Sequence, residues 1–276
     1  MERTKGFVDW SAWFRGWWNI PQAASDSPLF LHWIQARNNL RHQHWALAKQ
    51  RDQSLKRDRS RLEWLDFGAD GPNEGFMRTG SVAHLARKAS SDVRKGKWLM
   101  AIAKTVSLPA GETIRILELG TCLGSGADYL LSGARQGSFY LGLEGSDALA
   151  KRTAGRLAVH SNQQKTITVK TGPFEKTLPE LAMEEEPFHV IFLDGFHEGK
   201  ELEKQWEMLC PLRADGVAVV VDDIRWSKDM HDAWLRLTQQ KGWMALDLFR
   251  MGILTRVPQG HAEPEGVVRC SWYERA

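Results

Sequence analysis

The stretch RILELGTCLGSGADYLL, residues 115–131, decides the fold of this chain. Its first five residues form an apolar run that is typical of a strand buried on both faces. A glycine-rich turn follows, and residues 127–134 then have the character of a helix. Glycines let a backbone approach a ligand closely, and the free N–H groups of a helix N-terminus point toward it. The pattern indicates a nucleotide cradle, and a tight turn without a ligand is the alternative.

A second apolar run, residues 139–143, ends in Glu144. In doubly wound nucleotide-binding folds, an acidic side chain at this strand tip can accept both hydroxyls of a ribose. Two cofactors fit, a nicotinamide dinucleotide and S-adenosylmethionine. The dinucleotide requires glycines spaced G-x-G-x-x-G, whereas the spacing here is G-x-x-x-G-x-G. Glu118 would repel a pyrophosphate but suits the amino group of a methionine moiety, so we favour S-adenosylmethionine.

Composition bounds the class of protein. The 276 residues suffice for one large domain or for a domain with an extension. The net charge of +3 is too small to require a nucleic-acid partner. The three cysteines lack metal-ligand spacing, and their odd number argues against a disulfide framework, so we expect a cytoplasmic protein. No run approaches the ~20 consecutive apolar residues of a transmembrane segment, and no signal peptide is recognisable.

Residues 1–80 differ in character from the rest and are predicted to be a Trp-rich, basic helical extension that ends in a glycine-rich loop at 66–80. Five aromatic residues at helical spacing form one apolar face: Trp10, Trp13, Phe14, Trp17 and Trp18. This face could dock on the main domain or on a second copy in a homo-oligomer, lie in a membrane interface, or shape a substrate pocket. We favour docking, because such aromatic stripes are usually buried.

The stretch from Arg37 to Arg61 carries eight cations against two anions. Such a stretch could contact RNA or a membrane surface. We favour a solvated helix face, because few aromatic residues are interleaved with the cations. A nucleic-acid partner is therefore an alternative that we do not favour.

From residue 81 onward the pattern predicts a cofactor-binding domain, 81–257, followed by a short tail, 258–276. Residues 81–106 are predicted to form two helices with a break near Lys95-Gly96. Strand and helix patterns then alternate, as in an α/β domain with a parallel sheet. The predicted strands are 115–119, 139–144, 166–170, 188–193 and 217–221, and the predicted helices are 125–134, 147–159, 175–182, 199–209 and 228–240.

The last two apolar runs, 243–249 and 252–257, lie too close together for a helical crossover, so they should pair as an antiparallel hairpin. The predicted fold class is therefore α/β, a Rossmann-like doubly wound sheet of five parallel strands plus an antiparallel C-terminal hairpin. A dehydrogenase sheet usually has six parallel strands, so this feature also favours S-adenosylmethionine.

Three carboxylates follow predicted strands, Asp194 after one and Asp222 and Asp223 after the next. Ligands of open α/β sheets bind at the carboxyl ends of strands. Carboxylates gathered there repel one another, and a divalent cation such as Mg²⁺ would relieve the repulsion. Alternatively, Asp194 faces the positive part of the cofactor while one of the other two caps a helix. We lean toward the metal.

His197 lies three residues after Asp194, at the same strand tip. A neutral imidazole there could take the proton from a hydroxyl nucleophile, because its pKa lies near working pH. An incidental loop histidine is the alternative. Trp226 could wall an apolar acceptor or belong to the core.

These residues together resemble a known family, the class I S-adenosylmethionine-dependent methyltransferases, nearest the catechol and caffeoyl-CoA type O-methyltransferases and a related bacterial branch. The matching pieces are ILELGTCLGSGADYLL (116–131), LGLEGSDALAKRTAGRL (141–157), FHVIFLDGFHEG (188–199) and LRADGVAVVVDDIRWSKDMHDAW (212–234). The resemblance covers about residues 65–255.

The resemblance implies residue roles. The implied cofactor-binding residues are Glu118, Gly120, Thr121, Gly124, Ser125, Glu144, Gly172, Phe174 and Asp194. Metal-dependent members carry acidic residues that match Asp194, Asp222 and Asp223. His197 stands where those members have a catalytic lysine, which is a departure from the pattern. The Trp-rich and basic N-terminal region has no counterpart that we can match.

The sequence therefore predicts a methyltransferase that uses S-adenosylmethionine and acts on a hydroxyl of a small-molecule acceptor. The predicted catalytic residues are His197 and Asp194. A methyltransferase of RNA or another macromolecule, and a non-catalytic scaffold that keeps the fold, are the alternatives.

Overall fold

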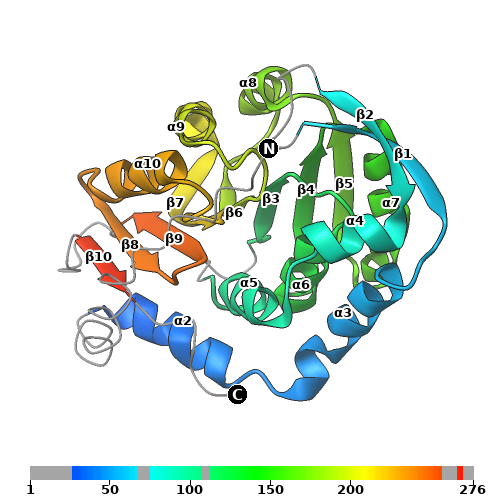
Figure 1. Ribbon diagram of the computed structural model, residues 1–276. Helices are drawn as coiled ribbons and strands as arrows, with labels where there is room; N and C mark the ends of the chain where they lie inside the picture. Colours follow the sequence, from blue (N-terminus) through cyan, green and yellow to red (C-terminus); the bar gives the residue numbers. More distant parts are fainter. Residues whose placement is uncertain (1–26, 68–74, 107–111, 257–265, 270–276) are drawn as a thin grey trace.

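The computed structural model describes residues 27–67, 75–106, 112–256 and 266–269 (Figure 1). Its centre is an eight-stranded sheet with the order β10-β8-β9-β7-β6-β3-β4-β5. The five parallel strands are β3 (Arg115–Leu119), β4 (Phe139–Glu144), β5 (Thr166–Thr171), β6 (Phe188–Leu193) and β7 (Arg213–Asp222). Each lies where the alternation of patterns predicts a strand, and β7 begins four residues earlier than expected.

The C-terminal strands β8 (Trp243–Asp247) and β9 (Met251–Arg256) form the predicted antiparallel hairpin, and β9 pairs antiparallel with β7. The predicted fold class is confirmed. Within the tail, β10 (Gly266–Arg269) adds a strand parallel to β8 that the sequence analysis did not predict.

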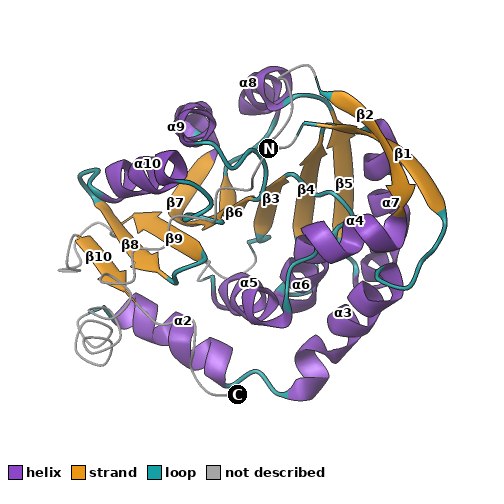
Figure 2. Cartoon of the chain, viewed as in Figure 1, coloured by secondary structure: helices purple, strands orange, loops and turns teal. Residues whose placement is uncertain are grey.

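Helices cover both faces of the sheet, as Figure 2 shows. Side chains alternate along each strand, so that Val190 and Phe192 of β6 face one helical layer while Ile191 and Leu193 face the other. The first layer contains α5 (Val93–Thr105), α6 (Ser125–Gly133) and α7 (Asp147–Leu157), which continues into a 3₁₀ turn (Ala158–Gln163). The second contains α8 (Phe174–Glu184), α9 (Gly199–Met208) and α10 (Lys228–Thr238), with a 3₁₀ turn (Cys210–Leu212) after α9.

The described part of the N-terminal region has the predicted helical character in α2 (Pro28–Asn38) and α3 (His42–Leu55), which pack against α5 and α6 (Figure 1). The aromatic stripe at residues 10–18 lies outside the described residues. The prediction of a helix up to residue 65 and of an unstructured loop at 66–80 is wrong. Instead, β1 (Arg61–Asp66) pairs antiparallel with β2 (Phe76–Ser81), and the two strands are called the hairpin below.

Local hydrogen bonds and packing explain this hairpin. The Asp58 side chain accepts a hydrogen bond from the Ser60 backbone N–H at 2.8 Å, which turns the chain after α3. Trp64 is buried, and its ring lies over Gly80 of the opposite strand, where a Cβ atom would come within 3.3 Å of it. One tryptophan over one glycine is too short a pattern to be recognised in the sequence as a strand pair.

The helix break that we expected near Lys95 lies earlier, between α4 (Val82–Ala89) and α5. The Asp92 side chain accepts a hydrogen bond from the Lys95 backbone N–H at 2.9 Å and thereby caps α5, a contact that contributes about 1 kcal/mol. Gly96 is inside the helix because its face packs against Tyr129 of α6, whose ring lies 2.5 Å from the position of a Cβ atom. Within the described residues, no helix is both long enough and apolar enough to cross a membrane.

Candidate active site

A cavity of about 570 Å³ lies at the carboxyl ends of the parallel strands. Strand ends and the turns after them contribute Gly120, Cys122, Glu144, Gly145, Asp194, Gly195, Asp222 and Asp223. The hairpin β1–β2, α4 and the start of α5 contribute the opposite wall, with Trp64, Leu65, Asp66, Phe67, Arg78, Thr79, His84, Leu85, Lys88 and Lys95. The cavity is therefore built by the α/β domain and the N-terminal region together.

The glycine turn is shaped by contacts within the protein. Gly120 has φ +87°, and a Cβ atom there would lie 2.5 Å from the carbonyl oxygen of Asp194. Gly124 has φ +73°, and a Cβ atom there would lie 2.8 Å from the Thr153 side chain on α7. A side chain at either position would push the turn away from the neighbouring elements, so both glycines are required before any ligand is considered.

The predicted cofactor-binding residues separate into two groups. Four of them line the cavity: Gly120, Glu144, Phe174 and Asp194. The other five, Glu118, Thr121, Gly124, Ser125 and Gly172, are not among its lining residues.

Glu118 and Ser125 are buried beneath the glycine turn. The Glu118 carboxylate accepts a hydrogen bond from the Tyr140 hydroxyl at 2.6 Å. Burial raises the pKa of Glu118 to about 8, although Tyr140 and the Ala127 backbone N–H oppose this shift. The Ser125 hydroxyl donates to Asp52 of α3 at 3.1 Å. Both side chains thus support the turn from behind.

Glu144 stands at the tip of β4 with 7% of its surface exposed. Its carboxylate accepts hydrogen bonds from the backbone N–H groups of Cys122, at 2.7 Å, and Ser146, at 2.9 Å. Burial raises its pKa, and these backbone donors counteract the effect. Each carboxylate oxygen has a second acceptor site, so Glu144 is oriented and still able to accept a hydroxyl from the cavity.

Three non-glycine residues that line the cavity have left-handed backbone conformations: Cys122 with φ 46°, Phe196 with φ 50° and Asp223 with φ 46°. Such conformations cost about 1–3 kcal/mol each and are concentrated at functional sites. No sequence pattern marks these three positions.

The acidic end of the cavity contains Asp194, Asp222 and Asp223. Burial raises the pKa of Asp194 well above its usual range, and the Asp222 carboxylate raises it further. Burial also opposes ionisation of Asp222, but Lys95 outweighs it and keeps the pKa of Asp222 below its usual value. Asp223 has a raised pKa because it is buried beside Asp222.

Lys95 is the residue that the sequence analysis missed. Its ammonium Nζ contacts Asp222 Oδ2, and the two side chains are 12% and 1% exposed. Lys95 comes from the first turn of α5, 127 positions before Asp222. Nothing in the local sequence distinguishes it from the other lysines and arginines of that helix.

The predicted metal site does not fit this arrangement. Among the residues that the structure describes, no group of three or more His, Cys, Asp or Glu side chains is placed to hold a metal ion. The positive charge beside Asp222 is already supplied by Lys95. The carboxylates do gather at the sheet edge as predicted, but the cation placed among them is the Lys95 ammonium.

His197 and Trp226 line the same end of the cavity. Their rings lie 5.2 Å apart between centroids at an interplanar angle of 35°. His197 lowers the pKa of both Asp222 and Asp223 electrostatically, which places the imidazole near these carboxylates. Trp226 is 49% exposed, so it belongs to the cavity wall and not to the core.

The hairpin covers the cavity beside Glu144. The Phe67 ring packs on Gly145, where a Cβ atom would lie 2.4 Å from it. The Leu65 backbone N–H donates to the Ser146 hydroxyl at 3.3 Å. Because these contacts join β1 to the residues that follow β4, the N-terminal region is part of the cofactor end of the site.

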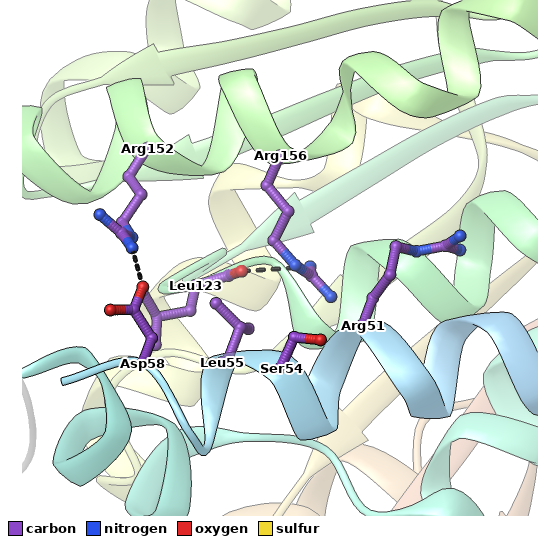
Figure 3. Close-up of a pocket in the computed structure, with 7 residues that line it drawn as sticks. All are labelled: Arg51, Ser54, Leu55, Asp58, Leu123, Arg152 and Arg156. Carbon is purple, nitrogen blue, oxygen red and sulfur yellow. Dashed lines mark hydrogen bonds and ion pairs between the residues drawn. The ribbon is translucent and has the colours of Figure 1, made fainter. Parts of the chain in front are cut away.

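A second cavity, of about 390 Å³, lies behind the glycine turn (Figure 3). Arg156 of α7 donates to the carbonyl oxygens of Gly124, at 2.5 Å, and Leu123, at 3.2 Å. It also pairs with Asp128 of α6 at 2.6 Å, and Arg51 of α3 pairs with the same carboxylate at 2.5 Å. The basic stretch therefore uses Arg51 to hold α3 against the turn.

Comparisons with known proteins agree with this geometry. Residues 117–224 match the family described as "Methyltransferase domain". No curated protein matches the chain in sequence. Solved structures also match the chain in fold.

Three of these structures illustrate the likeness. The O-methyltransferase from Bacillus cereus in complex with SAH is 19% identical, with a TM-score of 0.52 over 61% of this chain and 83% of that one. Cofactor-bound Rv0187 from MTB is 19% identical, with a TM-score of 0.53 over 78% and 90%. SAH-bound PaMTH1 from Podospora anserina is 17% identical, with a TM-score of 0.50 over 93% and 99%.

Residues 117–224 thus match a methyltransferase domain, and the sheet that contains them has the class I methyltransferase fold. The enzyme class predicted from the glycine turn and the strand tips, an S-adenosylmethionine-dependent methyltransferase, is confirmed at the level of this domain and fold.

Proposed function

We propose that the protein transfers the methyl group of S-adenosylmethionine to a hydroxyl of a small molecule. The observation that carries this proposal is a single cavity with two chemically different ends. A buried, oriented carboxylate, Glu144, lies at one end, and His197 lies with Asp222 at the other. When bound, the cofactor supplies an electrophilic methyl group on a sulfonium.

At the cofactor end, Glu144 accepts the ribose hydroxyls. Phe174 and Leu149 line the same region and offer apolar surface to the adenine. Phe174 is held by an edge-to-face contact with Phe196, with ring centroids 5.7 Å apart. Gly120 leaves backbone, without a side chain, facing the cavity.

At the acceptor end, His197 accepts the hydroxyl proton and Trp226 provides a flat apolar wall. The hydroxyl oxygen must lie in line with the methyl carbon, and holding the two reactants in this geometry lowers the barrier by about 7–11 kcal/mol. The sequence also predicted a divalent cation at this end. In the structure, the cation in contact with Asp222 at this end is Lys95.

The size and charge of the site support a small acceptor. A cavity of about 570 Å³ falls in the range of small-molecule sites. Two cations of the basic stretch are engaged within the protein, Arg51 with Asp128 and Lys56 with Asp52. Among the described residues Cys122 and Cys210 are free thiols, which is in keeping with the reducing cytoplasm that we propose as its location.

The test begins with calorimetric titration of S-adenosylhomocysteine into wild type and Glu144→Ala. We expect micromolar binding that weakens at least 100-fold in the variant. Methyl transfer from radiolabelled S-adenosylmethionine is then measured to a panel of phenols and aliphatic alcohols, with total RNA as a separate arm. Absence of S-adenosylhomocysteine binding, or label found only in RNA, would refute the proposal.

A further inference from the structure

We infer that the Lys95 ammonium is the resident cation of the strand-end carboxylates and that it holds the acceptor oxygen in place of a divalent metal ion. The inference rests on the proposed function, because it concerns the acceptor end of the same cavity.

The placement of Lys95 is determined by how α5 packs. Asp92 caps the helix at the Lys95 backbone N–H, at 2.9 Å. Gly96 allows the ring of Tyr129 to lie directly against the helix. These two contacts fix the first turn of α5 beside the carboxyl end of β7, so the side chain of Lys95 reaches Asp222 from the cavity wall.

The ammonium and a metal ion would occupy the same place. Lys95 Nζ lies in direct contact with Asp222 Oδ2, so a metal ion bound to this oxygen would have to displace the ammonium. A divalent ion at that oxygen would overlap with the ammonium and would be repelled by its positive charge. In a site with so little exposure to water, this repulsion is only weakly screened.

Asp222 is held by two neighbouring side chains of the cavity. Besides the contact with Lys95, its carboxylate forms a side-chain hydrogen bond with Asp194, whose pKa is raised well above its usual range. An ammonium has three N–H donors, and one of those of Lys95 is used by Asp222. A hydroxyl that enters the cavity can therefore accept a hydrogen bond from the Lys95 ammonium and donate one to the His197 imidazole.

The reaction balances with these groups. The O–H bond breaks and its proton goes to the His197 imidazole, while an oxygen lone pair forms the new bond to the methyl carbon. The methyl–sulfur bond breaks and its electron pair stays on sulfur, giving S-adenosylhomocysteine. Lys95 keeps its proton throughout and stabilises the negative charge that develops on the oxygen.

The experiment measures Mn²⁺ binding by electron paramagnetic resonance and calorimetry on metal-free wild type, Lys95→Ala and Lys104→Ala. Lys104 lies on the same helix but is exposed, so its variant is the matched control. We expect wild type and Lys104→Ala to bind Mn²⁺ at least 100-fold more weakly than Lys95→Ala, whose three carboxylates have lost their cation. Binding in Lys95→Ala should disappear when Asp222→Asn is added.

Two outcomes would overturn the inference. One is tight Mn²⁺ binding by wild type that Asp222→Asn abolishes. The other is a folded Lys95→Ala protein that binds no more Mn²⁺ than wild type. If Lys95→Ala does not fold, Lys95→Met combined with Asp222→Asn removes both charges, and the wild-type titration still decides the first outcome.

Titration with S-adenosylhomocysteine separates this inference from the proposed function. All three proteins should bind it within threefold of one another, because the ribose carboxylate is untouched. If wild type does not bind S-adenosylhomocysteine, the proposed function is refuted. The Mn²⁺ titration tests the role of Lys95 independently of that result.

Discussion

The carboxylate of Asp128 is the centre of the contacts behind the glycine turn, and replacing it with asparagine tests whether those contacts hold the cofactor site. Asp128 is 1% exposed and pairs with Arg51 at 2.5 Å, Arg156 at 2.6 Å and the His160 ring at 2.7 Å. Burial opposes its ionisation, but these partners outweigh burial and lower its pKa. Asp128 is therefore ionised near neutral pH.

Asp128→Asn keeps the shape of the side chain and removes the charge that two arginines face. Loss of one partner of a buried ion pair costs about 3–5 kcal/mol. Because Arg51 is 25% exposed and regains some solvation, we expect the lower end, about 3 kcal/mol. For a protein of this size, that corresponds to a fall in Tm of about 6–12 °C. Arg156 would also hold Gly124 less firmly, so S-adenosylhomocysteine affinity should fall on the order of tenfold, or ~1.4 kcal/mol.

The assay is urea unfolding of wild type and Asp128→Asn, with Asp232→Asn as the control because its pair with Lys228 is on the surface. The control should unfold at the same urea concentration as wild type. The lowered pKa of Asp128 means that its stabilisation is present above pH 4 and is lost as pH falls through the folded-state pKa. The gap between wild type and Asp128→Asn should therefore narrow below pH 4. If the free energy of unfolding of Asp128→Asn lies within about 1 kcal/mol of that of wild type at pH 7, the reasoning is wrong, because a change that small is what a surface substitution produces.

Three further predictions concern single residues of the site. Burial raises the pKa of Glu118 to about 8, so the folded protein holds a proton that the unfolded protein has lost. The free energy of unfolding should therefore fall by about 2 kcal/mol as pH rises from 6 to 8. Urea unfolding at both pH values should show this fall in wild type and not in Glu118→Gln. Gly120→Ala should lower stability by about 1–3 kcal/mol and abolish S-adenosylhomocysteine binding, because its Cβ atom meets Asp194 at a backbone angle that alanine disfavours; unchanged calorimetry would contradict this. Trp226→Ala should raise KM for the acceptor while S-adenosylhomocysteine affinity stays the same, and a loss of that affinity would place Trp226 at the other end of the cavity.

The α/β domain was predictable because its signals are long and repeated. Each of its parallel strands is an apolar run followed by a turn and a helical pattern, and the boundaries of β3, β4 and β6 agree with the prediction. The pairing of β1 with β2 was not predictable, since it depends on Trp64 meeting Gly80 across 16 positions. The break before α5 depends on the Asp92 cap, which is a single side chain. Gly96, near which the sequence predicts the break, lies inside the helix.

Within the site, the sequence located residues but did not reveal the direction of their side chains. Parallel strands end at one edge, so Glu144 and Asp194 were expected at the cavity, and both line it. Glu118 is on the adjacent strand, but its carboxylate is buried against Tyr140, behind the turn. Ser125 likewise faces α3, because the N-terminal helices pack where a cofactor contact had been expected.

The three acidic strand ends show most clearly where sequence reasoning stops. Their mutual repulsion required a positive charge, and that requirement follows from the order of the strands alone. Which cation meets it depends on the packing of α5, since Lys95 reaches Asp222 only because Asp92 starts the helix and Gly96 lets it approach α6. Either a metal ion or a lysine can supply the positive charge that the three carboxylates require. The lysine lies 127 positions before Asp222, in a helix whose position cannot be predicted from the pattern of strands. The need for a positive charge thus follows from the order of the strands, whereas the residue that supplies it is determined by the packing of α5.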